Sequence, residues 1–232
     1  MPEQNGCFCW PQITVLICTL NEEANLPYVL PKIPATVHEV LIVDGRSTDN
    51  TVSIARQLRP DARVIYQTGR GKGDALQCGI AQATGDIIVT LDADGTTDPE
   101  EMAGFVEPLL RGYDFAKGSR FALGRPEKKP AHRIFGNWLI VATANILYRR
   151  NYTDLCSGYN AFWKEAFRRI NFTADGFEDE PLINVRAIKA GLKIREVPHR
   201  DRGRINGETN APSFRQGWKA IKTVVRERFR SL

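Results

Sequence analysis

The stretch GDIIVTLDADGTTDP, residues 85–99, is an apolar run that ends abruptly in acidic residues. Its residues 87–91 predict a buried strand. Asp92 and Asp94 follow at the carboxyl end of this strand, which is where an open α/β sheet binds its ligands. Two carboxylates one residue apart can share a hard divalent cation whose other ligands are phosphate oxygens and water. The stretch therefore predicts a metal–diphosphate site, and a plain turn that uses Asp and Gly is the alternative.

Strands and helices alternate on both sides of this stretch. Short runs rich in apolar residues predict strands at Ile13–Leu20, Glu39–Asp44, Ala62–Gln67, Phe115–Arg120 and Lys193–Val197. Apolar residues at helical spacing predict helices that include Val52–Leu58, Ile134–Tyr148 and Leu182–Lys189. The segment Asp154–Phe162 is expected to be compact and rich in turns. Because helices regularly separate the strands, we predict an α/β fold with a mostly parallel sheet flanked by helices.

The composition is that of one ordinary globular domain. The chain has 232 residues, of which 42% are hydrophobic and 25% charged, so a substantial core is expected and disorder is not. The net charge of +5 favours phosphorylated ligands or an anionic membrane surface, and no nucleic-acid-binding motif accompanies it. Five cysteines, an odd number, predict reduced thiols and hence a cytoplasmic protein. The longest apolar stretch, Trp138–Tyr148, is far shorter than the ~20 residues that span a bilayer.

Two further segments contain residues that are candidates for binding a nucleotide or a phosphate. Asp44 ends the second predicted strand within IVDGRSTDNT, where its carboxylate can accept hydrogen bonds from a ribose or a base. A plain turn explains this aspartate equally well. The run GRGKG, residues 69–73, precedes a predicted helix, and its backbone N–H groups could surround a phosphate. Its spacing is neither that of a Walker A loop nor that of GxGxxG, so this run alone does not identify the ligand.

Taken in order along the chain, these motifs resemble the family 2 inverting glycosyltransferases with the GT-A fold. The resemblance is carried by ICTLNEEANL (17–26), VDGRSTDNT (43–51), GKGDAL (71–76), LDADG (91–95) and KGSRF (117–121). Later segments look most like dolichyl- or polyprenyl-phosphate sugar synthases: DLCSGYNAF (154–162), GFEDE (176–180), KIREVP (193–198) and RINGETN (204–210). The resemblance implies transfer of a sugar, with inversion, from GDP-mannose or a UDP-sugar to a polyprenyl or dolichyl phosphate.

The resemblance also implies a division of the single GT-A domain. Residues 1–11 would be a tail, residues 12–120 the half that binds the nucleotide sugar, residues 121–210 the acceptor-side half, and residues 211–232 a basic amphipathic helix. In the first half, four side chains are expected to bind the nucleotide, the last of them near the base: Thr19, Glu22, Asp44 and Asp74.

Charged side chains are implied to handle the phosphates of donor and acceptor. Asp92 and Asp94 would face the donor diphosphate through Mg²⁺ or Mn²⁺, and Asp94 would take part in catalysis. Arg204 would contact phosphate from a late loop and offset the charge that develops on the leaving nucleoside diphosphate. Arg120 and Arg133 would hold the acceptor phosphate in line for attack. Ordinary surface arginines are the alternative interpretation of these two residues.

Asp179, in the acidic triplet 178–180, separates two mechanisms. A hydroxyl acceptor, on a glycan, glycolipid or small molecule, needs a general base, and Asp179 could be that base. A phosphate acceptor is already an anion and needs none. A favourable charge at the N-terminus of the helix predicted at residues 182–189 is a structural explanation of the same residue.

Two positions depart from the family pattern. Asn160 stands where an arginine is frequent, and Asn210 stands where a lysine is frequent.

The end of the chain predicts a basic amphipathic helix. One face of it is apolar, with Phe214, Trp218, Ile221, Val225 and Phe229, and lysines and arginines surround that face. Such a helix suits the surface of an anionic membrane, so peripheral attachment to the cytoplasmic face is expected. Packing of the apolar face against the catalytic domain is the open alternative.

For the whole protein, the alternative to an enzyme is a catalytically silent protein that binds a nucleotide sugar. The intact pair Asp92 and Asp94 argues against this alternative.

Overall fold

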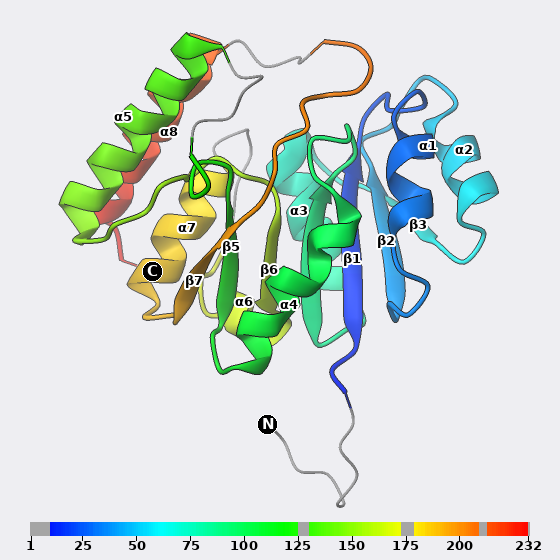
Figure 1. Cartoon of the computed structure of the whole chain (residues 1–232), viewed down its shortest axis with the longest axis horizontal. Coiled ribbons are helices and arrows are strands. Elements are labelled where there is room, and N and C mark those ends of the chain that lie inside the picture. The colour runs from blue at the N-terminus through cyan, green and yellow to red at the C-terminus, as the bar shows by residue number, and fades with distance from the viewer. Residues whose placement is uncertain (1–9, 125–129, 173–178, 209–212, 232) are drawn as a thin grey trace, which may run out of the picture.

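The computed structural model describes residues 10–124, 130–172, 179–208 and 213–231, with the backbone alone for residues 179 and 213–215. Within these ranges one seven-stranded sheet, in the order β3-β2-β1-β4-β6-β5-β7, forms the centre of the molecule (Figure 1). The strands are β1 Ile13–Thr19, β2 Glu39–Asp44, β3 Arg63–Tyr66, β4 Ile87–Asp92, β5 Phe115–Ser119, β6 Asn160–Trp163 and β7 Ile194–Pro198.

The sheet is mostly parallel, as predicted. Strand β1 pairs in parallel with β2 and β4, β2 with β3, and β5 with β7, whereas β6 runs antiparallel between β4 and β5. The segment Asp154–Phe162 was predicted to be compact and rich in turns, and the strand β6 that begins at Asn160 was not predicted. Asn160, Ala161 and Phe162 are all buried, so this short strand shows no alternation of apolar and polar residues by which it could be recognised.

Helices cover both faces of the sheet (Figure 1). One core cluster joins the sheet to α1 (Leu26–Val29), α2 (Thr51–Leu58) and α4 (Met102–Leu110). A second cluster, on the other face, joins it to α3 (Gly71–Gln82), α6 (Lys164–Arg168) and α7 (Asp179–Lys189). Single 3₁₀ turns at Leu30–Lys32 and Pro99–Glu101 follow α1 and precede α4. Because β1, β2 and β4 are buried on both faces, they read as nearly continuous apolar runs, which is why the sequence revealed them.

Two long helices form a separate outer layer. Helices α5 (Ala131–Tyr148) and α8 (Ser213–Phe229) lie side by side at one end of the molecule (Figure 1). Ala220 and Val224 of α8 pack with Ile140 and Ala144 of α5 in a third buried cluster. The C-terminal helix therefore packs on the domain with part of its surface and leaves Trp218 and other apolar residues exposed.

The structure bears on several expectations about membrane spans, cysteines and the chain's first residues. No helix within the described residues is both long and apolar enough to cross a membrane. The cysteines of the described ranges, Cys18, Cys78 and Cys156, form no disulfide with one another. Most of the predicted tail, residues 1–9, and the position of Asn210 lie outside the described residues. The division into donor and acceptor halves remains a prediction.

Candidate active site

A cavity of about 480 Å³ opens where β1 and β4 reach their carboxyl ends. Its wall also includes the N-terminus of α3, the segment after β5, the loop before α8, and parts of α5 and α8. Most of the predicted site residues meet here, although they come from widely separated parts of the chain: Thr19, Glu22, Asp92, Asp94, Arg120, Arg133 and Arg204.

Two loops at this edge of the sheet are tied together and place Glu22 at the cavity. Asn21 has a left-handed backbone (φ 55°), and its side-chain oxygen accepts a hydrogen bond from the N–H of Thr48 at 2.8 Å. The N–H of Glu22 donates to Thr51 Oγ1 at 2.8 Å, and that of Glu23 to Asp49 Oδ2 at 3.2 Å. Asparagine tolerates the left-handed conformation better than most residues. The motifs NEEAN and STDNT therefore act as one structural unit.

Arg204 joins the late loop to two of the acidic residues. Its guanidinium donates to both oxygens of Glu22, at 2.9 and 2.8 Å, and Nη1 lies 3.5 Å from Asp94 Oδ2. Burial raises the pKa of Glu22, against the opposing effect of its hydrogen bonds to Asn25 and Arg204. Gly95 has φ +80° and a Cβ there would collide with Ile205, so the loop packs directly on the DADG turn. Arg204 therefore lies against this acidic cluster, and its contact with a phosphate of the donor stays a prediction.

Lys72 and Glu180 are site residues that the sequence analysis missed. Lys72 Nζ lies 2.7 Å from Asp92 Oδ1 and 2.5 Å from Glu180 Oε1, and all three residues line the cavity. Burial opposes ionisation of Asp92, but the nearby Lys72 ammonium outweighs it and lowers the pKa of Asp92. Gly158 closes in on the same group, because a Cβ at this position would lie 2.6 Å from Asp92 Oδ2 and 2.7 Å from Lys72 Nζ.

Asp44 and Asp74 do not line the cavity. Asp44 is fully buried, and its carboxylate accepts hydrogen bonds from Thr19 Oγ1 at 3.1 Å and from the N–H and Oγ of Ser47. Asp74 accepts a hydrogen bond of 2.7 Å from the N–H of Gly69. Both carboxylates therefore fix loops that border the cavity, and their direct contact with a nucleotide stays a prediction.

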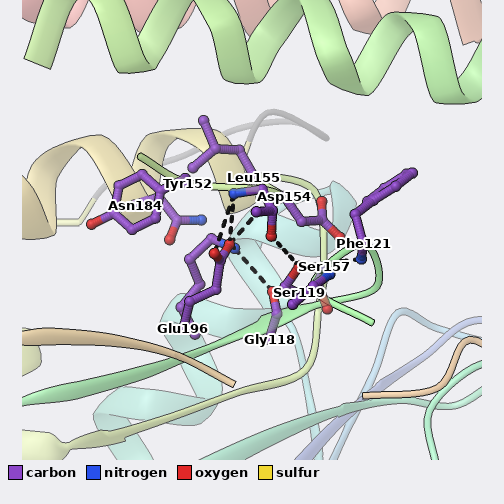
Figure 2. A network of polar contacts seen from close by, with 12 residues as sticks. Gly118, Ser119, Phe121, Tyr152, Asp154, Leu155, Ser157, Asn184 and Glu196 are labelled. Atoms are coloured by element: carbon purple, nitrogen blue, oxygen red, sulfur yellow. Dashed lines mark hydrogen bonds and ion pairs between the residues drawn. The ribbon is translucent and has the colours of Figure 1, made fainter. Parts of the chain in front are cut away.

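Arg120 is held in place by a fully buried carboxylate. Its Nε and Nη2 donate to the two oxygens of Asp154, at 2.6 and 2.9 Å. Burial alone would raise the pKa of Asp154, but the Arg120 guanidinium holds it well below its usual range. Lys117, also fully buried, lies 3.3 Å from Glu196, which accepts hydrogen bonds from the backbone of Thr153 and Asp154. Figure 2 shows Asp154 and Glu196 in this network of polar contacts. The bidentate pair of Arg120 with Asp154 presents the rest of the Arg120 guanidinium in one orientation.

The remaining wall comes from α5 and from the start of α7. Arg133 of α5 lines the cavity together with His132 and Asn137. Asp179 is the first residue of α7, and its side chain lies outside the described part of the structure. The next residue, Glu180, is the one whose carboxylate contacts Lys72. Asn160, which replaces a frequent arginine, is buried in β6 and donates from Nδ2 to the carbonyl of Ser157 at 3.2 Å.

The model of glycosyl transferase family 2 matches residues 14–170. The chain belongs to this family. It is 34% identical over 208 residues to the glycosyltransferase AglJ of Haloferax volcanii, covering 88% of this chain and 68% of that protein. It is 32% identical over 225 residues to the dolichyl-phosphate hexose transferase of the same organism, covering 94% of this chain and 95% of that protein.

A solved structure gives the same answer for the fold. The glucosyl-3-phosphoglycerate synthase of Mycobacterium tuberculosis, crystallised with Mg²⁺ and uridine diphosphate, superposes with a TM-score of 0.73 at 25% identity. The match covers 94% of this chain and 79% of that one. Together these findings confirm the predicted GT-A fold and show that the chain is a glycosyltransferase that uses a nucleotide-sugar donor.

Proposed function

We propose that this glycosyltransferase transfers a sugar from a nucleotide diphosphate sugar to a polyprenyl or dolichyl phosphate. The observation that carries the proposal is the pair Arg120–Asp154, which fixes a guanidinium at the wall of a cavity that Asp92 and Asp94 also line. An arginine fixed in this way favours a phosphate as the bound acceptor group. Arg133 adds a second positive charge to the same cavity. The similarity to a dolichyl-phosphate hexose transferase supports the same acceptor class.

The acidic wall suits a divalent cation. Asp92 and Asp94 both reach the cavity, with side chains 26% and 21% exposed, and their oxygens are ligands that Mg²⁺ and Mn²⁺ prefer. The described residues contain no cluster of three metal-ligating side chains, so the two carboxylates would share the ion with donor oxygens and water. The cation would neutralise charge on the donor diphosphate. A solved relative that contains Mg²⁺ and uridine diphosphate supports this assignment.

The residues of this chain then act on the two ends of the reaction. Thr19 and Glu22 border the nucleotide, while Lys72 and Arg204 offset negative charge on the leaving group. Arg120 and Arg133 orient the acceptor phosphate so that one oxygen attacks the anomeric carbon as its bond to the diphosphate breaks. The nucleoside diphosphate leaves and the anomeric configuration inverts. Cys156 also lines the cavity, but burial raises its pKa to about 12, so its thiol is a poor covalent nucleophile.

The proposal is tested with labelled donors and a lipid acceptor. Purified enzyme and Mn²⁺ are incubated with UDP-glucose, UDP-GlcNAc or GDP-mannose, with and without polyprenyl phosphate in detergent, and label is followed into an organic phase. Lipid-dependent transfer of an acid-labile product is expected with one donor. Donor turnover without organic-phase label would contradict the proposal and favour a hydroxyl acceptor. In that case Asp179→Asn should abolish turnover and leave donor binding intact, as expected for a general base.

The compartment forms part of the same proposal. We propose that the enzyme works at the cytoplasmic face of a membrane as a peripheral protein, and the odd number of cysteines and the proposed lipid-phosphate acceptor support this.

A further inference from the structure

Helices α5 and α8 expose large apolar side chains to solvent. On α5, Phe135 is 62% exposed and Ile146 78%, while on α8 Trp218 is 60% and Phe229 82% exposed. Exposed aromatic residues at this density are unusual on a soluble surface and mark an interaction site. We call the following set the α5/α8 face: Phe135, Trp138, Leu139, Ile146, Trp218, Val225 and Phe229.

The exposed residues of both helices point away from the domain. Ile140 and Ala144 of α5, and Ala220 and Val224 of α8, are buried in one cluster with Val185 of α7. At 100° per residue the exposed positions lie on the opposite side of each helix from these buried ones. The two helices lie side by side at one end of the molecule (Figure 1). Both helices therefore expose apolar side chains at this end of the molecule.

The charge around this face is positive. The exposed basic side chains of α8 and the residues after it are Lys219, Lys222, Arg226, Arg228 and Arg230. The one acidic residue in the sequence of α8 is Glu227, which is fully buried and lies within 4 Å of Arg186, Lys189 and Arg230. The sequence of α5 contains no acidic residue. Lys222 Nζ lies 5.6 Å from the centre of the Trp218 ring, so charged and apolar groups alternate on one surface.

We infer that the α5/α8 face binds an anionic lipid bilayer. Tryptophan and phenylalanine enter the boundary between headgroups and acyl chains, and the surrounding lysines and arginines attract anionic headgroups. A second copy of this chain would bring two basic surfaces together, which Coulomb repulsion opposes. The inference rests on the proposed function in one respect. If the acceptor is a lipid phosphate, binding of this face to the bilayer explains how the acceptor reaches the cavity.

The cavity and the face share the same two helices. The inner sides of α5 and α8 contribute Gly136, Asn137, Gln216 and Gly217 to the cavity wall, next to Arg133. A bilayer on the outer sides therefore lies one helix layer from the arginines proposed to hold the acceptor phosphate. The membrane surface and the acceptor site are consequently adjacent parts of one structure.

The test uses co-sedimentation with vesicles that contain neither donor nor acceptor. Wild-type protein should bind vesicles of phosphatidylcholine and phosphatidylglycerol in equal parts at least about tenfold more strongly than pure phosphatidylcholine. The double variant Trp218→Ser/Phe229→Ser should weaken this binding on the order of tenfold or more. Lys222→Glu/Arg226→Glu should weaken it similarly and remove the salt dependence.

Matched controls change equally exposed residues elsewhere. Tyr28→Ser alters a 53% exposed aromatic on α1, and Arg111→Glu alters an exposed arginine at the end of α4, and both should bind vesicles like the wild type. The inference is overturned if Trp218→Ser/Phe229→Ser binds like the wild type, or if that variant instead abolishes a dimer in sedimentation. All variants are also assayed for sugar transfer in detergent, where Trp218 and Phe229 should not matter. Failure of the proposed function would appear there as absent wild-type transfer, independently of vesicle binding.

Discussion

The two walls of the cavity carry opposite charge and are built differently. The wall at the ends of β1 and β4 is acidic, and its carboxylates already contact cations from distant segments, Lys72 of α3 and Arg204 of the late loop. The wall after β5 is basic, and Arg120 is fixed from beneath by the buried Asp154. A diphosphate can bind at the acidic wall only with cations between it and the carboxylates. The guanidinium of Arg120 on the basic wall can contact an anion directly. We therefore propose that the donor binds at the acidic wall and the acceptor at the basic wall.

The largest expected effect comes from the acidic wall. Asp94→Asn and Asp92→Asn should each lower kcat/KM for transfer by about a thousandfold, because charge on the leaving diphosphate is no longer compensated through these carboxylates. Steady-state kinetics over a range of Mn²⁺ concentrations measures the loss. Asp86→Asn, an exposed aspartate just before β4, should behave like the wild type. Loss of less than about tenfold in both variants would remove the metal–diphosphate role of this wall.

The basic wall should respond more moderately. Arg120→Gln should lower kcat/KM for the lipid phosphate about a hundredfold and leave the KM for the donor unchanged, because charge-assisted hydrogen bonds to the acceptor are lost. The single change also leaves Asp154 without its partner and should cost about 3 kcal/mol of stability.

A companion variant separates these two effects of Arg120. Arg120→Gln/Asp154→Asn removes both buried charges, so its thermal stability should recover while acceptor binding stays weak. If activity recovers together with stability, Arg120 is a structural residue only.

Gly158 packs against the acidic wall, and its substitution should give a smaller effect. A methyl group at this position meets the Asp92 carboxylate and Lys72 Nζ, so Gly158→Ala should shift both side chains and lower kcat/KM by about tenfold. The control is Gly104→Ala in α4, where an added Cβ meets nothing within 4 Å. Equal kinetics of the two alanine variants would show that the position of Asp92 is not critical.

The last expected effect concerns the pH dependence of stability and not turnover. Burial lowers the pKa of His199 to about 4, and its Nε2 lies 2.8 Å from Ser157 Oγ. The unfolded chain therefore binds this proton at a higher pH than the folded one, so stability is full above about pH 6.5 and falls as the pH drops toward 4. The contribution should approach about 1 kcal/mol per pH unit within this window. Carboxylates with lowered pKa, such as Asp92 and Asp154, lose stabilisation only below about pH 3.9.

Chemical denaturation at several pH values measures the contribution of His199. The variant His199→Gln should show a flatter profile between pH 6.5 and about 4. A profile parallel to that of the wild type would contradict the assignment to His199.

The sequence predicted residues at strand ends better than residues whose place depends on partners from distant segments, for physical reasons. Asp92 and Asp94 end a buried parallel strand, so their position follows from strand direction alone. Lys72 was missed because a lysine in a glycine-rich run reveals no partner, and Glu180 acquires its role only through that lysine. Strand β6 was missed because it is short, buried on both faces and antiparallel. The exposed face of α8 was predicted as apolar, but the burial of Ala220 and Val224 beneath it depends on tertiary packing.

The most direct test of the two-wall account is a crossed binding measurement. Calorimetry would follow UDP or GDP with Mn²⁺, and separately a soluble short-chain prenyl phosphate, on Asp94→Asn and on Arg120→Gln/Asp154→Asn. The account predicts that the first variant loses nucleotide binding and keeps prenyl phosphate binding, and that the second does the reverse. Loss of both ligands in either variant, or a swapped pattern, would contradict the assignment of donor and acceptor to opposite walls.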